Sequence, residues 1–256
     1  MRSERQLAML REMGIRCWGP QADAVPRLAD SPLPAVEQTG AAAGEHASVV
    51  MEVRPTAAGP SSAAALDWPA LRAAVAGCTA CKLCEGRRQT VFGVGNERAH
   101  WMVVGEAPGE QEDQRGEPFV GKSGQLLDNM LRAIGLTRGE AAPALQVYIA
   151  NTVKCRPPGN RNPEPDELAT CEPFLIRQVQ LVQPKIILAM GRFAVRSLLR
   201  STEPIGRLRG RVHHYQGVPL IVTYHPAYLL RNPEDKAKAW DDLCLAVEAA
   251  QPRAQR

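Results

Sequence analysis

Four continuous apolar runs recur along the chain, each long enough for a buried strand: residues 100–104, 147–150, 185–190 and 218–223. Apolar runs without alternation are typical of strands in a parallel sheet that is covered on both faces. Helical patterns accompany them at residues 68–75, 124–134, 165–181 and 193–199. This alternation with short links predicts an α/β fold, a three-layer α/β/α sandwich around a four-stranded, mostly parallel sheet.

The first 65 residues follow a different pattern. Leu7, Leu10 and Met13 would share one face of a short amphipathic helix within residues 1–18. Such a stripe more often packs on its own domain, although it is also a candidate contact for a partner protein. Residues 19–65 are rich in Ala, Pro, Gly and Ser and predict a disordered linker. The folded domain is therefore expected at residues 66–250.

Length, charge and composition are compatible with several classes of α/β protein. A length of 256 residues suits one sizeable α/β domain with an extension, and a net charge of +4 is compatible with nucleic acid without arguing for it. No apolar run reaches a membrane-spanning length, and residues 1–20 lack the apolar centre of a signal peptide. We expect a monomer in the reducing cytoplasm, associated with the nucleoid, where cysteines are ligands or core residues.

Cysteine spacing carries the most chemical information. Cys78-x2-Cys81 is followed, after a long gap, by Cys155-x15-Cys171. Four converging thiolates would hold Zn²⁺ or an iron–sulfur cluster, and the second spacing favours iron–sulfur because a zinc ribbon usually supplies two short-spaced pairs. By spacing alone Cys84 could replace Cys78. The alternative is a set of scattered buried thiols.

Polar residues follow each predicted strand at its carboxyl end. Glu106 follows the first, Asn151 the second, Gly191-Arg192 the third and His225 the fourth. Ligands of such sheets bind beyond these ends, so the four positions predict a single crevice.

Two loops near Glu106 and Asn151 offer both structural and functional interpretations. The segment Gly121-Lys122-Ser123-Gly124 either caps the next helix, with Ser123 at or near the N-cap, or holds a phosphodiester on its backbone amides. Phe119 is either a core residue or a surface on which a base stacks. Nucleoside triphosphates and dinucleotides are poorly supported, because neither of their glycine-rich motifs is present.

The segment after the fourth strand is equally ambiguous. His225 could donate a hydrogen bond to a developing anion. Leu229 and Leu230 would form either an exposed apolar wedge of the kind that holds a DNA gap open, or a core-facing helix turn. Arg207, Arg209 and Arg211 are either a phosphate-contacting rim or a solvated charged face.

Four motifs occur in order: Gly105-Glu106-Ala107-Pro108-Gly109, Pro118-Phe119-Val120-Gly121-Lys122, Asn151-Thr152-Val153-Lys154-Cys155-Arg156-Pro157-Pro158 and His225-Pro226-Ala227-Tyr228-Leu229-Leu230-Arg231. With the cysteine quartet, these motifs resemble the uracil-DNA glycosylase superfamily, specifically its iron–sulfur family 4 branch, over roughly residues 70 to 247. The resemblance implies a DNA repair enzyme that flips uracil out of DNA and hydrolyses its N-glycosidic bond by water attack at C1′. It would be a monofunctional glycosylase that starts base excision repair.

The resemblance also implies individual roles. A [4Fe–4S] cluster would be bound by Cys78, Cys81, Cys155 and Cys171, with Cys84 a non-ligand and Cys17 and Cys244 incidental. Glu106 would lie next to the attacking water and His225 would stabilise charge at uracil O2. Uracil would also contact Ala107, Phe119 and Asn151. The implied DNA contacts are Lys122, Ser123, Leu229, Leu230 and Arg231.

Two departures and two alternatives remain open. Some relatives carry Asp as the water activator where this chain has Glu106, with Asp113 further on, so Glu106 is either a base or a group that orients water. Another branch has a histidine loop that traps DNA covalently; residues 155–162 contain no histidine, so trapping is not expected. The alternatives to a glycosylase are a non-catalytic iron–sulfur nucleic-acid-binding or redox protein on the same fold, and a zinc-stabilised nucleotide-binding module.

Overall fold

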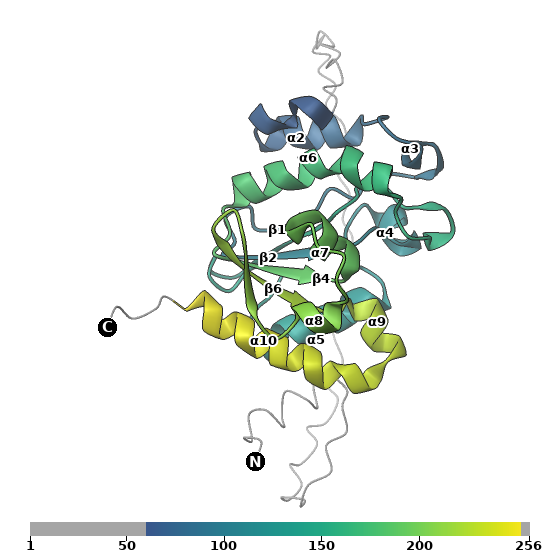
Figure 1. Cartoon of the computed structure of the whole chain (residues 1–256). Helices are drawn as coiled ribbons and strands as arrows, with labels where there is room; N and C mark the ends of the chain where they lie inside the picture. The colour runs from purple at the N-terminus through teal and green to yellow at the C-terminus, as the bar shows by residue number, and fades with distance from the viewer. Residues whose placement is uncertain (1–59, 252–256) are drawn as a thin grey trace, which may run out of the picture.

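The computed structural model describes residues 60–251 (Figure 1). The expected N-terminal helix and most of the expected linker lie outside the described residues. The last six linker residues, Pro60–Ala65, form the 3-10 helix η1, which contacts α6 (Pro165–Val182) and buries Ala63 completely. The described structure therefore includes residues before the expected boundary at residue 66.

A six-stranded sheet forms the centre of the domain, in the order β1-β3-β2-β4-β6-β5. Its four inner strands are parallel and confirm the predicted runs: β2 (Trp101–Gly105), β3 (Val147–Asn151), β4 (Ile186–Met190) and β6 (Val218–Thr223). The predicted number of four strands was wrong, because β1 (Val94–Gly95) and β5 (Val212–Tyr215) pair antiparallel at the two edges. β1 is only two residues long and β5 alternates between exposed and half-buried positions, so neither gives a continuous apolar run.

Helices cover both faces of the sheet, which confirms the three-layer α/β/α class (Figure 1). One face packs against α6 and α7 (Arg192–Leu199), and the other against α5 (Lys122–Ala133), α9 (Pro226–Arg231) and α10 (Lys236–Ala250). The remaining short helices are α2 (Trp68–Ala76), α3 (Leu83–Gly86), α4 (Glu110–Arg115), η2 (Pro158–Asn160), α8 (Ile205–Leu208) and η3 (Pro233–Asp235).

Side chains of the inner strands alternate between the two helical layers. In β2, Trp101 and Val103 pack towards α5 and α10, whereas Met102 and Val104 pack towards α6 and α7. Every residue of β2, β3 and β4 is buried, as expected for a sheet without a solvent face. A third apolar cluster joins η1, α2 and α6 to the end of β3 and includes Cys155 and Cys171.

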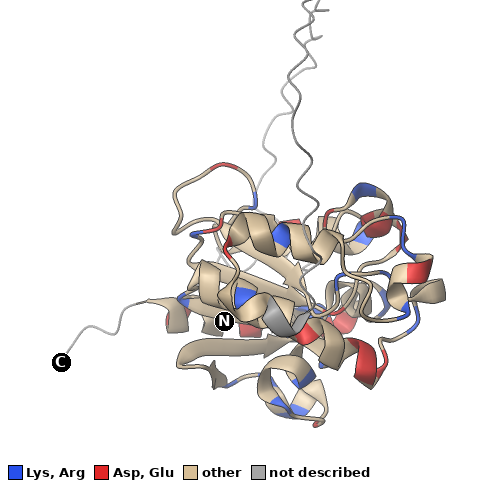
Figure 2. Ribbon diagram, turned by 90° about the horizontal axis from the view of Figure 1, so that it is seen from above, with Lys and Arg blue, Asp and Glu red and all other residues tan. Residues whose placement is uncertain are grey.

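The topology places the site. Strands β3 and β4 lie on opposite sides of β2. The connection from β2 to β3 therefore runs towards one edge of the sheet, and the connection from β3 to β4 crosses back over β2 towards the other edge. Ligand sites form at such a switch point, beyond the carboxyl ends of the strands. Charged side chains of both signs are interspersed over the helices and loops (Figure 2). No helix among residues 60–251 has the length and apolar character needed to cross a membrane.

Candidate active site and cysteine pocket

The predicted crevice is present at the carboxyl edge of the sheet. A cavity of about 370 Å³, the base cavity, is lined by residues that follow β2, β3 and β6, including Glu106, Asn151 and His225. Ala107, Phe119, Ser123 and Arg231 lie on its wall. A second cavity of about 480 Å³, the strand cavity, shares Glu106 and His225 and adds Gly191 and Arg192 from the end of β4. All four predicted strand ends therefore meet here.

Glu106 stands between the two cavities. Its Oε1 accepts a hydrogen bond from the backbone N–H of Phe193 at 3.3 Å, which ties it to the first turn of α7. Burial raises the pKa of Glu106 above its ordinary value, and this hydrogen bond and the charge of Arg192 partly oppose that shift. Gly191 has a φ of 92° and lies so close to Glu106 that a Cβ there would collide with the carboxylate.

Asn151 ends β3 with its side chain inside the base cavity. It is 2% exposed, and its Oδ1 is buried without a hydrogen-bond partner in the described chain. Gly105 makes this placement possible, because a Cβ on Gly105 would lie 2.5 Å from that oxygen and 2.6 Å from Cζ of Phe119. A buried amide oxygen of this kind normally has a partner, so it marks a place for a ligand donor.

Two aromatic rings form another wall of the base cavity. The rings of Phe119 and His225 stack with centroids 5.3 Å apart and planes at 27°. Phe119 has a φ of 55°, in the left-handed region that is uncommon for a bulky residue, and such strain is concentrated at functional sites. A planar ligand in this cavity would meet an aromatic face.

His225 is the N-cap of α9, and its tautomer is set by that role. Its Nδ1 accepts from the backbone N–H of Ala227 at 3.2 Å, so in the neutral ring the proton is on Nε2. Burial, together with the positive charge of Arg231, lowers the pKa of His225 to about 4. Near neutral pH the residue is therefore a neutral hydrogen-bond donor through Nε2.

Glu112 organises the loops around the cavity and was missed by the sequence analysis. Its carboxylate accepts from the backbone N–H groups of Gly109, Val120 and Gly121 at 3.1, 3.0 and 3.1 Å. It thereby joins the Glu106 loop to the Phe119 loop. Asp113, the acidic candidate named beside Glu106, accepts from the backbone N–H of Arg88 and lines neither cavity.

The segment after Cys155 forms the outer wall and was also missed. Asn160 and Asn162 line the base cavity, and Asn162 lines the strand cavity as well. Arg161 holds this loop by a bidentate ion pair with the buried Glu167, at 2.9 and 2.6 Å. Two asparagines thus occupy the wall of the cavity in a segment without a histidine. The signal available in the sequence was the run of Pro, Gly and Asn, which is typical of a loop.

The residues predicted to contact DNA do not all lie on the surface. Ser123 and Arg231 line the base cavity, Lys122 is exposed at the start of α5, and Leu230 is 45% exposed. The prediction was wrong for Leu229, which is fully buried in the core because α9 packs that side against α5. The N-cap of α5 is Gly121, and Ser123 is the second helical residue.

The strand cavity carries cations and aromatic rings. Arg192 and Arg231 line it, as do Tyr224 and Tyr228, whose rings stack with centroids 5.0 Å apart. Arg209 is not a free rim residue, since it pairs with the buried Asp242 at 3.0 Å.

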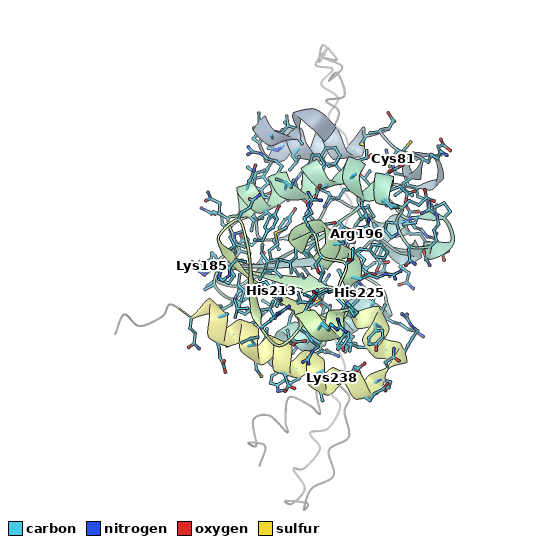
Figure 3. All side chains as sticks on the ribbon, viewed as in Figure 1. Cys81, Lys185, Arg196, His213, His225 and Lys238 are labelled. Carbon is cyan, nitrogen blue, oxygen red and sulfur yellow. The ribbon has the colours of Figure 1, made fainter. Side chains whose placement is uncertain are left out.

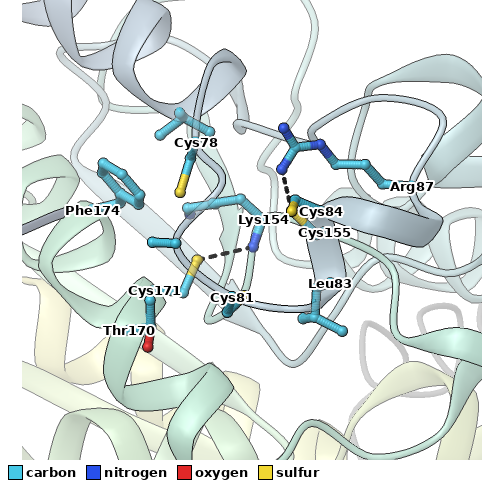
Figure 4. A pocket seen from close by; sticks show the side chains of 12 residues that line it. Cys78, Cys81, Leu83, Cys84, Arg87, Lys154, Cys155, Thr170, Cys171 and Phe174 are labelled. Carbon is cyan, nitrogen blue, oxygen red and sulfur yellow. Dashed lines mark hydrogen bonds between the residues drawn. The ribbon is translucent and has the colours of Figure 1, made fainter. Parts of the chain in front are cut away.

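A separate pocket, the cysteine pocket, lies beside α2, α3 and α6 (Figure 4). It is lined by five cysteines from three distant segments: Cys78, Cys81, Cys84, Cys155 and Cys171. Two of the sulfurs accept hydrogen bonds, Cys155 from Arg87 Nη1 at 3.1 Å and Cys171 from the backbone N–H of Lys154 at 3.3 Å. Figure 3 places Cys81 and His225 in different parts of the molecule, so the pocket is distinct from the base cavity.

The chemistry of this donor set fits a sulfur-ligated metal group. Burial raises the pKa of Cys171 to about 12, while the positive charge of Lys154 acts in the opposite direction, and a bound metal would favour the thiolate further. Burial also lowers the pKa of Lys154 to about 8. The open space is small, about 10 Å³, and within residues 60–251 no three His, Cys, Asp or Glu side chains stand as a group that could hold a metal ion. The fit therefore rests on the donor types and their convergence.

Cys244 lies apart from this pocket on α10, and none of the six described cysteines forms a disulfide.

Comparison with known proteins identifies the family of the chain. The family model of the uracil DNA glycosylase superfamily matches residues 92–244. A type-4 uracil-DNA glycosylase of Archaeoglobus fulgidus is 42% identical over 165 residues, which cover 61% of this chain and 80% of the relative. One of Thermotoga maritima is 42% identical over 163 residues, covering 63% and 82%. A type-5 uracil-DNA glycosylase of Mycobacterium leprae is 30% identical over 194 residues, covering 62% and 84%. The chain therefore belongs to the uracil-DNA glycosylase superfamily and, within it, to the type-4 uracil-DNA glycosylases.

Proposed function

We propose that this protein removes uracil from DNA by hydrolysing the bond between uracil N1 and deoxyribose C1′, and that it thereby starts base excision repair. The observation that carries the proposal is the buried, unpartnered Oδ1 of Asn151 in a cavity walled by aromatic rings. The N3–H of uracil is a donor for this oxygen, and the Asn151 amide N–H can donate to uracil O4. Cytosine presents the opposite donor and acceptor pattern on this edge and would leave buried polar groups unpaired.

Phe119 provides the face on which the extruded base stacks. Stacking of a base on an aromatic ring contributes roughly 1–3 kcal/mol. In this proposal the base takes a place beside Phe119 and Asn151, while Ala107 and the Glu112-held loops close the cavity around it.

His225 and Glu106 act on the two products of bond cleavage. As the N1–C1′ bond breaks, its electron pair goes to uracil, and the Nε2–H of neutral His225 donates to the developing charge on O2. The sugar becomes oxocarbenium-like, and Glu106 orients the water whose oxygen bonds to C1′. The proton that this water loses balances the charge of the departing uracil anion. No residue lining either cavity is a lysine, which supports a monofunctional glycosylase without a Schiff base.

The strand cavity extends the site beyond the reacting nucleotide. It opens from the same Glu106 and His225, and Arg192 and Arg231 on its wall suit phosphates of the flanking DNA. Lys122 and Ser123 at the start of α5 would contact the strand on the other side of the base cavity. Leu230 is the exposed apolar residue that would occupy the gap left by the extruded base.

We assign the cysteine pocket to a [4Fe–4S] cluster held by Cys78, Cys81, Cys155 and Cys171. The support is the convergence of these residues on one pocket and the family to which the chain belongs. When bound, the cluster would join α2, the end of β3 and α6. No step of the base excision involves it, because the base cavity is lined by other residues.

The function is tested with a labelled oligonucleotide that carries one uracil, followed by alkali to cut any abasic site. We expect cutting at the uracil and none in a thymine control. Asn151→Ala, His225→Ala and Glu106→Gln should each lower kcat/KM, by roughly 10²–10³-fold for a lost transition-state donor.

A glutamate and a histidine outside both cavities supply matched controls. Glu110→Gln removes a carboxylate on the exposed side of α4, and His214→Ala removes an exposed imidazole on β5; neither lines a cavity. Both should cut like the unmodified protein. A folded protein that never cuts at uracil would contradict the proposal and leave a nucleic-acid-binding or redox role.

A further inference from the structure

One lysine lies deep between the cysteine pocket and the base cavity. Lys154 is 1% exposed, and its Nζ donates to the backbone oxygen of Asn151 at 2.8 Å and to Oε1 of Gln178 at 2.6 Å. Its backbone N–H donates to the sulfur of Cys171, and the next residue in the chain is Cys155 (Figure 4). Lys154 therefore lines the cysteine pocket and contacts the backbone of Asn151, a residue of the base cavity.

The contacts of Lys154 are unusual for a buried lysine. No Asp or Glu of the described chain forms an ion pair with its Nζ. Burying an ammonium group is costly, and a buried lysine usually pairs with a carboxylate. Here both neutral acceptors of Nζ are parts of elements that frame the base cavity or the cysteine pocket, β3 and α6.

Gln178 fixes the other end of this arrangement. It is fully buried on α6, and its Nε2 donates to the backbone oxygen of Phe92 at 2.9 Å and to the hydroxyl of Tyr148 at 3.1 Å. Tyr148 belongs to β3, the strand that ends at Asn151. Lys154 is thus held by a fully oriented amide and has little freedom to move.

The same short segment also holds the Glu106 loop. Thr152 donates through its backbone N–H to the backbone oxygens of Gly105 and Glu106, both at 3.1 Å, and its hydroxyl donates to the Glu106 oxygen as well. Residues 151–155 are all buried and run from Asn151 in the base cavity to Cys155 in the cysteine pocket.

We propose that Lys154 is a positioning residue through which the cysteine pocket fixes Asn151 for uracil binding. This inference rests on the proposed function. Cys155, the next residue, and Cys171, whose sulfur accepts from the Lys154 backbone N–H, set the main chain of Lys154. The ammonium group of Lys154 then holds the carbonyl of Asn151, which orients the side chain that reads the base. Substitution of Lys154 should weaken recognition of the base without removing any group that touches it.

The experiment uses the full chain with its iron content measured. Lys154→Met keeps most of the side-chain length and removes the donors. We expect the folded, iron-containing variant to bind free uracil roughly 10-fold more weakly in calorimetry, the size expected for one charge-assisted hydrogen bond. KM for the uracil oligonucleotide should rise with it. Unchanged uracil affinity in this variant would overturn the proposal.

If Lys154→Met loses its iron or fails to fold, Gln178→Met tests the positioning role of Lys154 instead. It removes an acceptor of Nζ and touches no cysteine, so its iron content should be normal while its uracil affinity falls. Normal affinity in folded Gln178→Met would reject the positioning role.

Two control variants separate positioning from charge and from stability. Lys185→Met removes an exposed lysine at the opposite end of β4, and Leu243→Ala weakens the core beneath α10; both should keep full uracil affinity. A loss of affinity in Leu243→Ala as large as in Lys154→Met would show that instability alone causes it. Absence of uracil binding by the unmodified protein would count against the proposed function, whereas equal binding by protein and variant would count only against Lys154.

Discussion

At the scale of single residues, the site requires glycine at positions where a Cβ would collide with a functional side chain. Gly191 combines a φ of 92° with an approach to Glu106 that leaves no room for a Cβ. We expect Gly191→Ala to cost about 1–3 kcal/mol of backbone strain and, in addition, to displace Glu106 and lower kcat. Thermal unfolding and single-turnover excision measure the two effects separately.

Gly217 offers a control for that prediction. Its φ is 84°, and nothing lies within 4 Å of an added Cβ. Gly217→Ala should therefore carry the strain without the loss of activity. Equal losses of activity in the two variants would show that Gly191 affects the site only through stability.

The pKa values of the two reacting residues, Glu106 and His225, are shifted in opposite directions, and Glu106 sets the expected pH dependence of the reaction. His225, with a pKa near 4, stays neutral and a donor over the working range, whereas burial raises the pKa of Glu106 above 4.5. We expect kcat/KM to fall on acidification with an inflection above pH 4.5 as Glu106 takes up a proton. Glu106→Gln should lose this inflection and Glu110→Gln should keep it. An inflection that survives in Glu106→Gln would assign it to another group.

The free energy of unfolding should also depend on pH through the titration of His225. Its folded pKa of about 4 lies below the ordinary 6.5, so the unfolded chain binds the proton more readily between these values. The free energy of unfolding contributed by His225 is therefore lost as pH falls from about 6.5 to 4. Thermal unfolding should show a smaller decrease over this interval in His225→Ala than in the unmodified protein.

The cavity residues that directly follow strands could be predicted from the sequence. The residues that hold the loops around the cavity could not. Asn151 and His225 follow apolar runs directly, so their position implies the crevice. Glu112 lies within a polar helix, and its role comes from the amides of Val120 and Gly121, which reach it only after two loops fold together. The left-handed backbone of Phe119 likewise has no signal in the sequence.

At the scale of elements, α9 divides its two leucines between core and solvent. Leu229 is fully buried and Leu230 is 45% exposed. We expect Leu229→Ala to lower stability by roughly 2–5 kcal/mol and Leu230→Ala to leave stability almost unchanged. Leu230→Ala should instead slow excision from double-stranded more than from single-stranded DNA, because only the duplex leaves a gap to fill.

Comparison of the two substrates makes this prediction specific. The ratio of kcat/KM on single-stranded and double-stranded oligonucleotides should change for Leu230→Ala and stay constant for Leu229→Ala. An unchanged ratio for Leu230→Ala would exclude a wedge at this position.

The strands that the sequence could predict were those with a continuous apolar run. The four inner strands matched because both of their faces are covered, while β1 and β5 had too few or too polar residues to be recognised. Helix α10 carries Ala239, Leu243 and Ala246 at helical spacing, so the pattern that indicates this helix is also present in the sequence.

At the scale of the whole molecule, the cysteine pocket joins segments that the sheet separates. The Cys78 and Cys81 segment follows α2, Cys155 follows β3 and Cys171 lies in α6. Spacing predicted that these cysteines converge, since four distant thiols of this type suit a metal group. Spacing also left Cys84 as an alternative ligand, but it could not predict that Arg87 reaches the same pocket, because this depends on how α3 packs.

Substitution of the cysteines tests the assignment through colour, iron content and melting temperature. Cys155→Ala should lose the brown colour of an iron–sulfur protein and melt at a lower temperature, because a group that joins three segments would be gone. A loss of roughly 3 kcal/mol would lower the melting temperature by roughly 6–12 °C in a domain of this size. Cys244→Ala, on α10 and away from the pocket, should keep both properties. A brown Cys155→Ala protein with an unchanged melting temperature would reject the assignment.

The last assignment concerns the two cysteines that flank Cys81. Cys78 and Cys84 both line the pocket, so position does not choose between them. The family pattern opens with the pair Cys78 and Cys81, and on that basis Cys84→Ala should keep its iron while Cys78→Ala loses it. The reverse result would make Cys84 the ligand. If each single variant keeps its iron and only the double variant Cys78→Ala/Cys84→Ala loses it, either thiol can serve as the fourth ligand. The pocket would then bind the cluster with Cys78 or with Cys84.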